Sequence, residues 1–164
     1  GPNDWNSKSI TWGLFSLENS RFIHINLHYF WEHNEQGEQT RKQNSSQLLA
    51  FIKKLPYRQI PFIITGDFNC EEYTLPLQML LSSGLTLASA IVPHKICSHH
   101  VYPEFDEENC LYHSGSLFHP TRTAKDSIDH IFLKDAVCTR FVTVQDQEAL
   151  DASDHCPIYA DIEI

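Results

Sequence analysis

The sequence predicts an α+β domain. Segments 9–17, 21–28 and 158–164 alternate apolar and polar residues, which is typical of half-buried strands. Residues 38–55, in contrast, repeat their apolar residues with the period of a helix. The chain has 164 residues, of which 41% are hydrophobic. This size and composition suit one domain with a packed core and argue against disorder.

The first two strands are predicted to form a β-hairpin with its turn at residues 18–20. In the second strand Ile23, Ile25 and Leu27 point to one side, while Asn26 and His28 share the other side at the strand's end. A polar face in contact with solvent is the ordinary interpretation of such a pair.

A helix is predicted from residue 38 to residue 55 because Leu48, Ile52 and Leu55 follow the i, i+4, i+7 pattern and Pro56 ends it. Its first half, which includes Arg41, is polar. We therefore expect that half to be exposed.

The short apolar run 61–65 predicts a strand buried on both faces, which ends at Gly66-Asp67-Phe68-Asn69. If the extended backbone continues, Asp67 and Asn69 project to the same side. Both would then lie at one end of a buried strand.

A second helix follows, with Thr74 as its N-cap, Pro76 in its first turn and Gly84 after its end. A strand is expected over 85–91. Residues 92–126 are irregular and too long for an ordinary connection, which predicts a functional loop or a cover.

The last third of the chain contains an acid in an apolar strand. Segment 127–134 alternates so that Asp129 shares a side with Ile131 and Leu133. A lone buried carboxylate is costly, so Asp129 needs a partner. Another strand is predicted over 137–144, and a loop leads to Asp154 and His155 at the entrance to the final strand.

The net charge of −9 and the isoelectric point near 5.5 disfavour non-specific binding to duplex nucleic acid and favour a site for a hard divalent cation. The five cysteines, an odd number, fit no closed disulfide framework. We therefore expect a reducing compartment, the cytoplasm. Neither a membrane span nor a signal peptide is visible.

A second metal interpretation concerns the long loop, where cysteines and histidines gather. Their spacing fits no standard zinc motif, so a structural zinc site and scattered loop residues both remain open. The residues concerned are Cys97, His99, His100, Cys110 and His113.

Four motifs, in order, resemble those of the endonuclease/exonuclease/phosphatase superfamily, which has the DNase I-like fold. The similar elements are Asn26-Leu27-His28, Gly66-Asp67-Phe68-Asn69, Ser127-Ile128-Asp129-His130-Ile131-Phe132 and Ser153-Asp154-His155-Cys156-Pro157-Ile158. Four motifs in register are far more specific than one short match. The Asn-Leu-His and Gly-Asp-Phe-Asn sequences are more similar to those of bacterial hydrolases and deadenylase-like members than to those of abasic-site nucleases.

The resemblance implies a phosphoester hydrolase of the phosphodiesterase or nuclease type that uses Mg²⁺ or Mn²⁺. It implies metal ligands among Asp154, Asp67 and Asn69, with Asp67 and Asn69 also positioning or deprotonating the attacking water. His155 would act as general acid/base or stabilise the transition state, and Asp129 would orient it. His28 would bind a phosphate oxygen. The implied partner is a phosphoester substrate, with nucleic acid and nucleotides among the candidates.

The resemblance also implies a four-layer α/β/β/α sandwich, of which this chain holds the second half: one mixed sheet with flanking helices. Residues 1–2 are expected to be a scar of tag removal, and residues 3–164 the C-terminal portion of a single domain. Without the N-terminal half, an apolar sheet face is expected to be exposed. A partner fragment, self-association or a minimal variant would each account for this. The alternative function is a catalytically inactive fragment or pseudoenzyme that acts as an association module.

Overall fold

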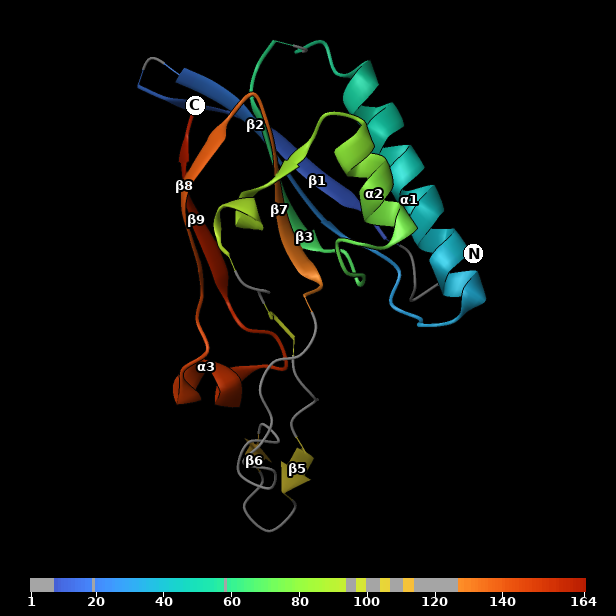
Figure 1. Ribbon diagram of the computed structural model, residues 1–164, viewed down its shortest axis with the longest axis vertical. Coiled ribbons are helices and arrows are strands. Elements are labelled where there is room, and N and C mark those ends of the chain that lie inside the picture. Colours follow the sequence, from blue (N-terminus) through green and yellow to red (C-terminus); the bar gives the residue numbers. More distant parts are fainter. Residues whose placement is uncertain are drawn as a thin grey trace.

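The computed structural model describes residues 8–18, 20–57, 59–93, 97–99, 104–106, 111–113 and 127–164 (Figure 1). The elements in order are β1 (Ile10–Leu17), β2 (Ser20–His28), α1 (Glu35–Lys54), β3 (Phe62–Asp67), α2 (Leu75–Ser82), β4 (Thr86–Leu87), the 3₁₀ helix η1 (Ala88–Ile91), β5 (Glu104–Asp106), β6 (Leu111–His113), β7 (Asp129–Lys134), β8 (Val137–Thr143), α3 (Gln147–Ala152) and β9 (Ile158–Glu163). The α+β class is confirmed.

The main sheet has the strand order β1-β2-β3-β7-β4. It is mixed, because β2 and β3 run parallel and the other neighbours run antiparallel. The strands β8 and β9 form a separate antiparallel pair, and so do β5 and β6. The parallel β2–β3 pair needs a crossover connection, and α1 supplies it.

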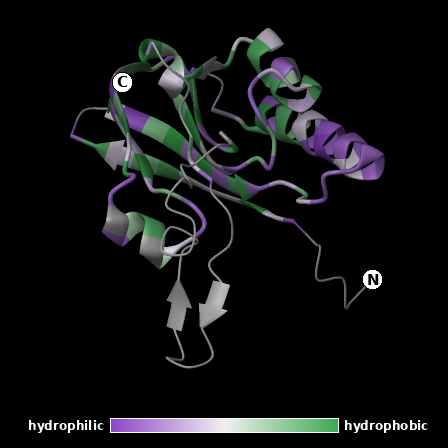
Figure 2. Ribbon diagram, turned by 60° about the horizontal axis from the view of Figure 1, so that its bottom comes forward, coloured by the Kyte–Doolittle hydropathy of each residue, from purple (hydrophilic) through white to green (hydrophobic). Residues whose placement is uncertain are grey.

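One face of the main sheet packs against α1 and α2 (Figure 1). Alternation along the strands directs Ile23, Ile64 and Phe132 to this face, where all three are fully buried. α1 is mostly hydrophilic, in contrast to the more hydrophobic strands (Figure 2). Its buried positions include Leu48, which contributes to the same core.

The opposite face is covered in part by β8 and β9. Ile131 and Leu133 of β7 pack there with Cys138 and Phe141 of β8. The structure therefore stacks a helical layer, the main sheet and a small second sheet. The predicted alternation of β9 is confirmed, since its residues are partly buried and exposed in turn.

Two predictions about α1 are wrong. The helix begins at Glu35, three residues earlier than expected, because the side chain of Asn34 accepts a hydrogen bond from the Gly37 N–H at 2.7 Å. Arg41 is buried, with only 6% of its surface exposed. Its Nη1 donates to the carbonyl oxygen of Phe30 at 3.2 Å and to that of Glu32 at 2.6 Å, so the guanidinium anchors the loop between β2 and α1.

The prediction that β3 is buried on both faces is only half right. Phe62 and Ile64 are fully buried, whereas Ile63 and Thr65 are partly exposed on the face that β8 and β9 cover incompletely. The predicted strand over 85–91 is also wrong beyond Leu87, where the chain turns into η1.

The ends of α2 match the prediction in position. Pro76 lies in the first turn, and Gly84 after the helix has a φ of 93°, in the left-handed region that glycine tolerates. Thr74 occupies the N-cap but makes no side-chain cap; its hydroxyl donates to the Glu71 carbonyl at 2.6 Å.

The sequence did not indicate α3, which replaces the loop predicted before Asp154. The Asp146 carboxylate caps this helix by accepting from the Ala149 N–H at 2.9 Å. In the described part of the chain, no helix is long and apolar enough to cross a membrane. Of the predicted loop 92–126, most lies outside the described residues.

Candidate active site

Three neighbouring strands end with polar side chains at one edge of the main sheet. The register pairs His28 of β2 with Asp67 of β3, and Asp67 with Asp129 of β7. The three residues therefore form a row across the sheet, although they lie far apart in the sequence. His28 is half exposed, and its Nε2 lies 3.2 Å from Asp67 Oδ2.

The turn after β3 places Asn69 against Asp67. The Asn69 N–H donates to Asp67 Oδ1 at 2.7 Å, and its Nδ2 donates to Asp67 Oδ2 and to the Tyr29 carbonyl, both at 3.1 Å. The predicted proximity is right, but the predicted extended backbone is wrong, because Asn69 has a φ of 50°. Asparagine tolerates this left-handed conformation better than most residues.

Gly66 lets β3 approach β2 closely just before this turn. Its φ is 152°, and a Cβ atom there would lie 2.0 Å from the carbonyl oxygen of Leu27. No side chain fits at that distance. The glycine of the Gly-Asp-Phe-Asn motif is therefore required by the backbone.

Asp129, a carboxylate among apolar neighbours on β7, is paired with His155. His155 Nδ1 lies 2.8 Å from Asp129 Oδ2, a hydrogen-bond distance. Because an ionised carboxylate only accepts, neutral His155 carries its proton on Nδ1 and has its lone pair on Nε2. Nε2 lies 4.0 Å from Asp67 Oδ2, so His155 lies between the carboxylates of β3 and β7 and is hydrogen-bonded to that of β7.

Ser98 supports this pair and was not identified from the sequence. It is fully buried. Its Oγ accepts the N–H groups of Ile128 at 3.3 Å and Asp129 at 3.1 Å, and its hydroxyl donates to Asp129 Oδ2 at 2.7 Å. Two accepted bonds occupy both lone pairs of Oγ, so its one proton is committed to Asp129. No local sequence signal marks Ser98, because all of these contacts cross about thirty residues.

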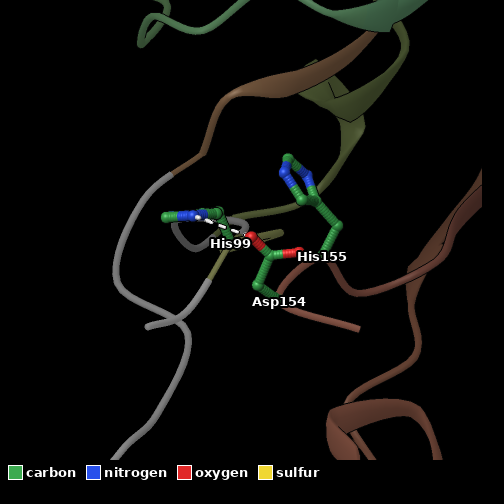
Figure 3. Close-up of side chains that lie close together, drawn as sticks. All are labelled: His99, Asp154 and His155. Carbon is green, nitrogen blue, oxygen red and sulfur yellow. Dashed lines mark ion pairs between the residues drawn. The ribbon is translucent and has the colours of Figure 1, made fainter. Parts of the chain in front are cut away.

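His99, next to Ser98, lies beside Asp154 (Figure 3). Its Nε2 is 4.0 Å from Asp154 Oδ2, and its ring meets the His155 ring edge-on with centroids 5.0 Å apart. Among the described residues, two groups could hold a metal ion: His99, Asp154 and His155, and Asp67, Asp129 and His155. His155 belongs to both groups.

The electrostatics of the site follow from burial and from its crowded charges. Burial raises the pKa of Asp67; the Asn69 N–H opposes this, and the charge of Asp129 adds to it. The hydrogen bond to Asp129 raises the pKa of His155, burial works against the rise, and the nearby carboxylates reinforce it.

A hollow of about 360 Å³ adjoins Asn69 and His99. Its wall also includes Arg41, Tyr73 and Thr74. Aromatic, cationic and hydroxyl groups therefore surround a space beside the row of polar side chains.

The structure brings His28, Asp67, Asn69, Asp129 and His155 together, with Asp154 next to His155. Their chemical roles remain predictions. The zinc interpretation of the long loop also stays a prediction: His100 and Cys110 lie outside the described residues, as does the side chain of His113.

Comparison with known proteins agrees with this fold. The sequence model of the Endonuclease/Exonuclease/phosphatase family matches residues 17–155, most of the chain. The chain therefore belongs to this family, and its α+β architecture is the DNase I-like one. None of the curated proteins matches the sequence.

Solved structures show the same fold at low sequence identity. Mannosyl-6-phosphatase Bt3783 of Bacteroides thetaiotaomicron VPI-5482 is 20% identical with a TM-score of 0.68, covering 96% of this chain and 57% of that one. A family protein from Bacteroides vulgatus has 19% identity, a TM-score of 0.70, and coverages of 98% and 58%. TDP2 of D. rerio, solved with a single-strand DNA product, has 16% identity, a TM-score of 0.70, and coverages of 99% and 64%. The chain thus spans between half and two thirds of each relative's length.

Proposed function

We propose that the full-length protein is a divalent-metal-dependent phosphoester hydrolase. The observation that carries this proposal is the row His28, Asp67 and Asp129 at one sheet edge, joined by His155. Family membership supports the same chemistry, since the similar structures include a phosphatase and a protein solved with a DNA product.

Asp67 and Asn69 are proposed to position the attacking water. Asp67 is suited to accept a proton, because burial and the neighbouring Asp129 raise its pKa towards the range of a useful base. The Asn69 side chain is fixed by two hydrogen bonds, so its remaining oxygen has a defined direction. Side chains fixed in this way would contribute to catalysis by positioning the attacking water.

His155 is proposed to act at the scissile phosphate through Nε2, either as general acid/base or as a positive charge. Asp129 holds its ring by the bond to Nδ1, and Ser98 in turn holds Asp129. The raised pKa of His155 favours the charged form, which would stabilise negative charge developing on the phosphate. His28, more exposed, is proposed to contact a phosphate oxygen.

The donor set fits a hard divalent ion. Asp154, Asp67 and Asn69 offer carboxylate and amide oxygens, the ligands that Mg²⁺ and Mn²⁺ take in proteins. Asp67 and Asp129 are partners in the strand register, and their ligand atoms lie within 4.8 Å of each other. Two carboxylates this close repel, which supports a cation nearby. When bound, such an ion would polarise the phosphoester and ease deprotonation of water.

The substrate is proposed only as a class, with a nucleic acid, nucleotide or sugar phosphate among the candidates. The net charge of −9 argues against non-specific duplex binding. Thiols outside any disulfide at Cys70, Cys138 and Cys156 support a reducing compartment, and we propose the cytoplasm.

The test is hydrolysis of bis-p-nitrophenyl phosphate by the full-length protein with and without Mg²⁺. We expect metal-dependent turnover that falls by about 10²–10⁴-fold in His155→Ala. Equal rates in the two proteins would contradict the proposed site.

The second candidate function is an inactive fragment or pseudoenzyme that serves as an association module. Exposed apolar side chains on the main sheet favour it: Phe15 is 47% exposed and Leu17 is 63% exposed. A missing N-terminal half or a second copy would cover this face. No turnover together with concentration-dependent dimerisation would favour this function over hydrolysis.

A further inference from the structure

The side chains of His99, Asp154 and His155 converge from two segments that are far apart in the sequence (Figure 3). Their possible ligand atoms all lie within 4.8 Å of one another. The 4.0 Å between His99 Nε2 and Asp154 Oδ2 is too long for a hydrogen bond. The side chains are 17–32% exposed, so the cluster is partly open to solvent.

The spacing of these atoms suits a small transition-metal ion. Zinc binds histidine nitrogen at about 2.0–2.1 Å and carboxylate oxygen at about 2.0–2.2 Å. Two ligands of one tetrahedral zinc are therefore about 3.4 Å apart. The His99–Asp154 distance of 4.0 Å exceeds this by about 0.6 Å, and no pair of ligand atoms, all within 4.8 Å, exceeds it by more than about 1.4 Å, so small side-chain rotations would bring the three ligand atoms to this spacing.

His155 is already prepared to bind a metal through Nε2. Its other ring nitrogen, Nδ1, lies 2.8 Å from the Asp129 carboxylate. Metal-binding histidines almost always donate their second N–H to a carboxylate or carbonyl in this way, which fixes the tautomer and makes the ligand more basic. The Ser98 hydroxyl fixes Asp129 in turn.

His99 is held beside the pair by the backbone. His99 and His155 form an isolated antiparallel β-bridge, and the Cys156 N–H donates to the Ser98 carbonyl at 2.7 Å. The position of His99 therefore depends on the same segment that carries Asp154 and His155. A ligand anchored by backbone hydrogen bonds loses little conformational entropy when it binds.

The donor chemistry differs from that of a magnesium site. Two imidazole nitrogens and one carboxylate suit zinc, whereas Mg²⁺ prefers oxygen ligands and retains its water. Three protein ligands, with water in the fourth position, are also a coordination that zinc commonly takes in proteins. We propose that His99, Asp154 and His155 form a Zn²⁺-binding site that is selective over Mg²⁺.

Occupation of this site has a consequence for hydrolysis. A zinc ion on His155 Nε2 removes the lone pair or proton that the proposed reaction uses, and it also occupies Asp154. Zinc therefore inhibits the magnesium-dependent reaction. This inhibition depends on the proposed function, but zinc binding itself does not.

The experiment measures metal binding without substrate, using full-length protein from which any histidine tag has been removed. Isothermal titration with Zn²⁺ should show one site per chain, and Co²⁺ should give the visible absorption of a tetrahedral nitrogen/oxygen site that excess Zn²⁺ abolishes. In His99→Gln the zinc affinity should fall by more than about 100-fold, because loss of a group that only orients a metal ligand already costs about 10–100-fold. Asp129→Asn, which removes the carboxylate that orients His155, should show that smaller loss.

The matched control is His24→Gln. His24 is also partly exposed, but its Nε2 contacts Thr65 Oγ1 at 2.9 Å on the main sheet. Its removal should leave zinc affinity unchanged. Circular dichroism would establish that each variant is folded.

The outcomes separate the two proposals. No saturable Zn²⁺ or Co²⁺ binding, or equal affinity in wild type and His99→Gln, would overturn the zinc site and leave a simple histidine–carboxylate contact. Zinc binding without any hydrolysis would count against the proposed function alone. With hydrolysis present, zinc should inhibit wild type, and His99→Gln should resist it relative to its own zinc-free rate.

Discussion

The two faces of the main sheet differ in packing although they share the same strands. On the face beneath α1 and α2, Ile64 and Phe132 are fully buried. On the opposite face, β8 and β9 cover only part of the surface, and Phe15 of β1 is 47% exposed. That face also carries His28, Asp67 and Asp129 at its edge.

This difference separates stability from chemistry within a single sheet. Strand alternation sends apolar side chains to the helical face, where burial supplies most of the folding free energy. At the strand ends the same alternation directs His28, Asp67 and Asp129 to the other face, where they need not be compatible with a dry core. A rigid packed layer on one side thus holds the site on the other.

The largest effect is expected at Asp67. Asp67→Asn should lower hydrolysis by at least about 10²-fold, because the amide cannot accept the proton. Stability at neutral pH should change little, because the amide removes a part-buried charge but can accept only one of the two hydrogen bonds from Asn69. The folded carboxyl has a pKa raised above 3.8, so its contribution to stability is lost as pH rises through that raised pKa, and the amide avoids this loss. Activity assays and thermal unfolding at pH 7 would measure hydrolysis and stability. A clear drop in stability would contradict the division of stability and chemistry between the two faces of the sheet.

The next effect compares a phenylalanine on each face. Phe132→Ala should destabilise the fold by about 3–5 kcal/mol, since it leaves a cavity in a fully buried core. Phe15→Ala should cost about 1 kcal/mol or less, because the ring is half exposed and its aromatic contacts in the described chain are a stack on Phe22 and a tilted contact with His24. Urea unfolding measures both values. Equal losses would mean that the second face is also covered in solution.

A smaller effect is expected for Ser98→Ala. It leaves the N–H groups of Ile128 and Asp129 without their acceptor, which should cost about 1–3 kcal/mol and also reduce hydrolysis. Ser45→Ala is the matched control, because Ser45 is also fully buried and contacts the Pro76 carbonyl and the Tyr29 hydroxyl, neither of which is among the proposed site groups. It should lose stability without losing activity. Equal hydrolytic activity in Ser98→Ala and Ser45→Ala would contradict a role for Ser98 in the active site.

The subtlest effect concerns Asp129→Asn, which should lower the pKa of His155 towards the ordinary 6.5, since the bond to Asp129 is the main cause of its raised value. In wild type the His155 contribution to stability is fully present below pH 6.5 and lost as pH rises through the raised pKa. The variant should lose this dependence. NMR titration of the His155 ring measures it, with exposed Asp161→Asn as control; an unchanged titration would contradict the pairing.

Local patterns predicted the elements that depend on alternation and on breakers. The hairpin β1–β2, the strand ending at Asp67 and the final strand from Ile158 match their predicted positions. The partial exposure of β3 and the 3₁₀ helix at residues 88–91 were not predictable. Both depend on how β8 and β9 pack against the main sheet. Arg41 shows the same limit. Its polar surroundings in the sequence predicted exposure, but its guanidinium is buried and donates hydrogen bonds to two loop carbonyls.

The sequence by itself determined which residues could perform chemistry, because acids, amides and histidines at strand ends are visible as short motifs. Only the tertiary structure decided their neighbours. The β2–β3–β7 register sets His28, Asp67 and Asp129 in one row, and the bridge between His99 and His155 brings Ser98 and His99 to that row. The physical reason is that alternation and turn chemistry act over a few residues, whereas strand pairing joins residues many tens of positions apart.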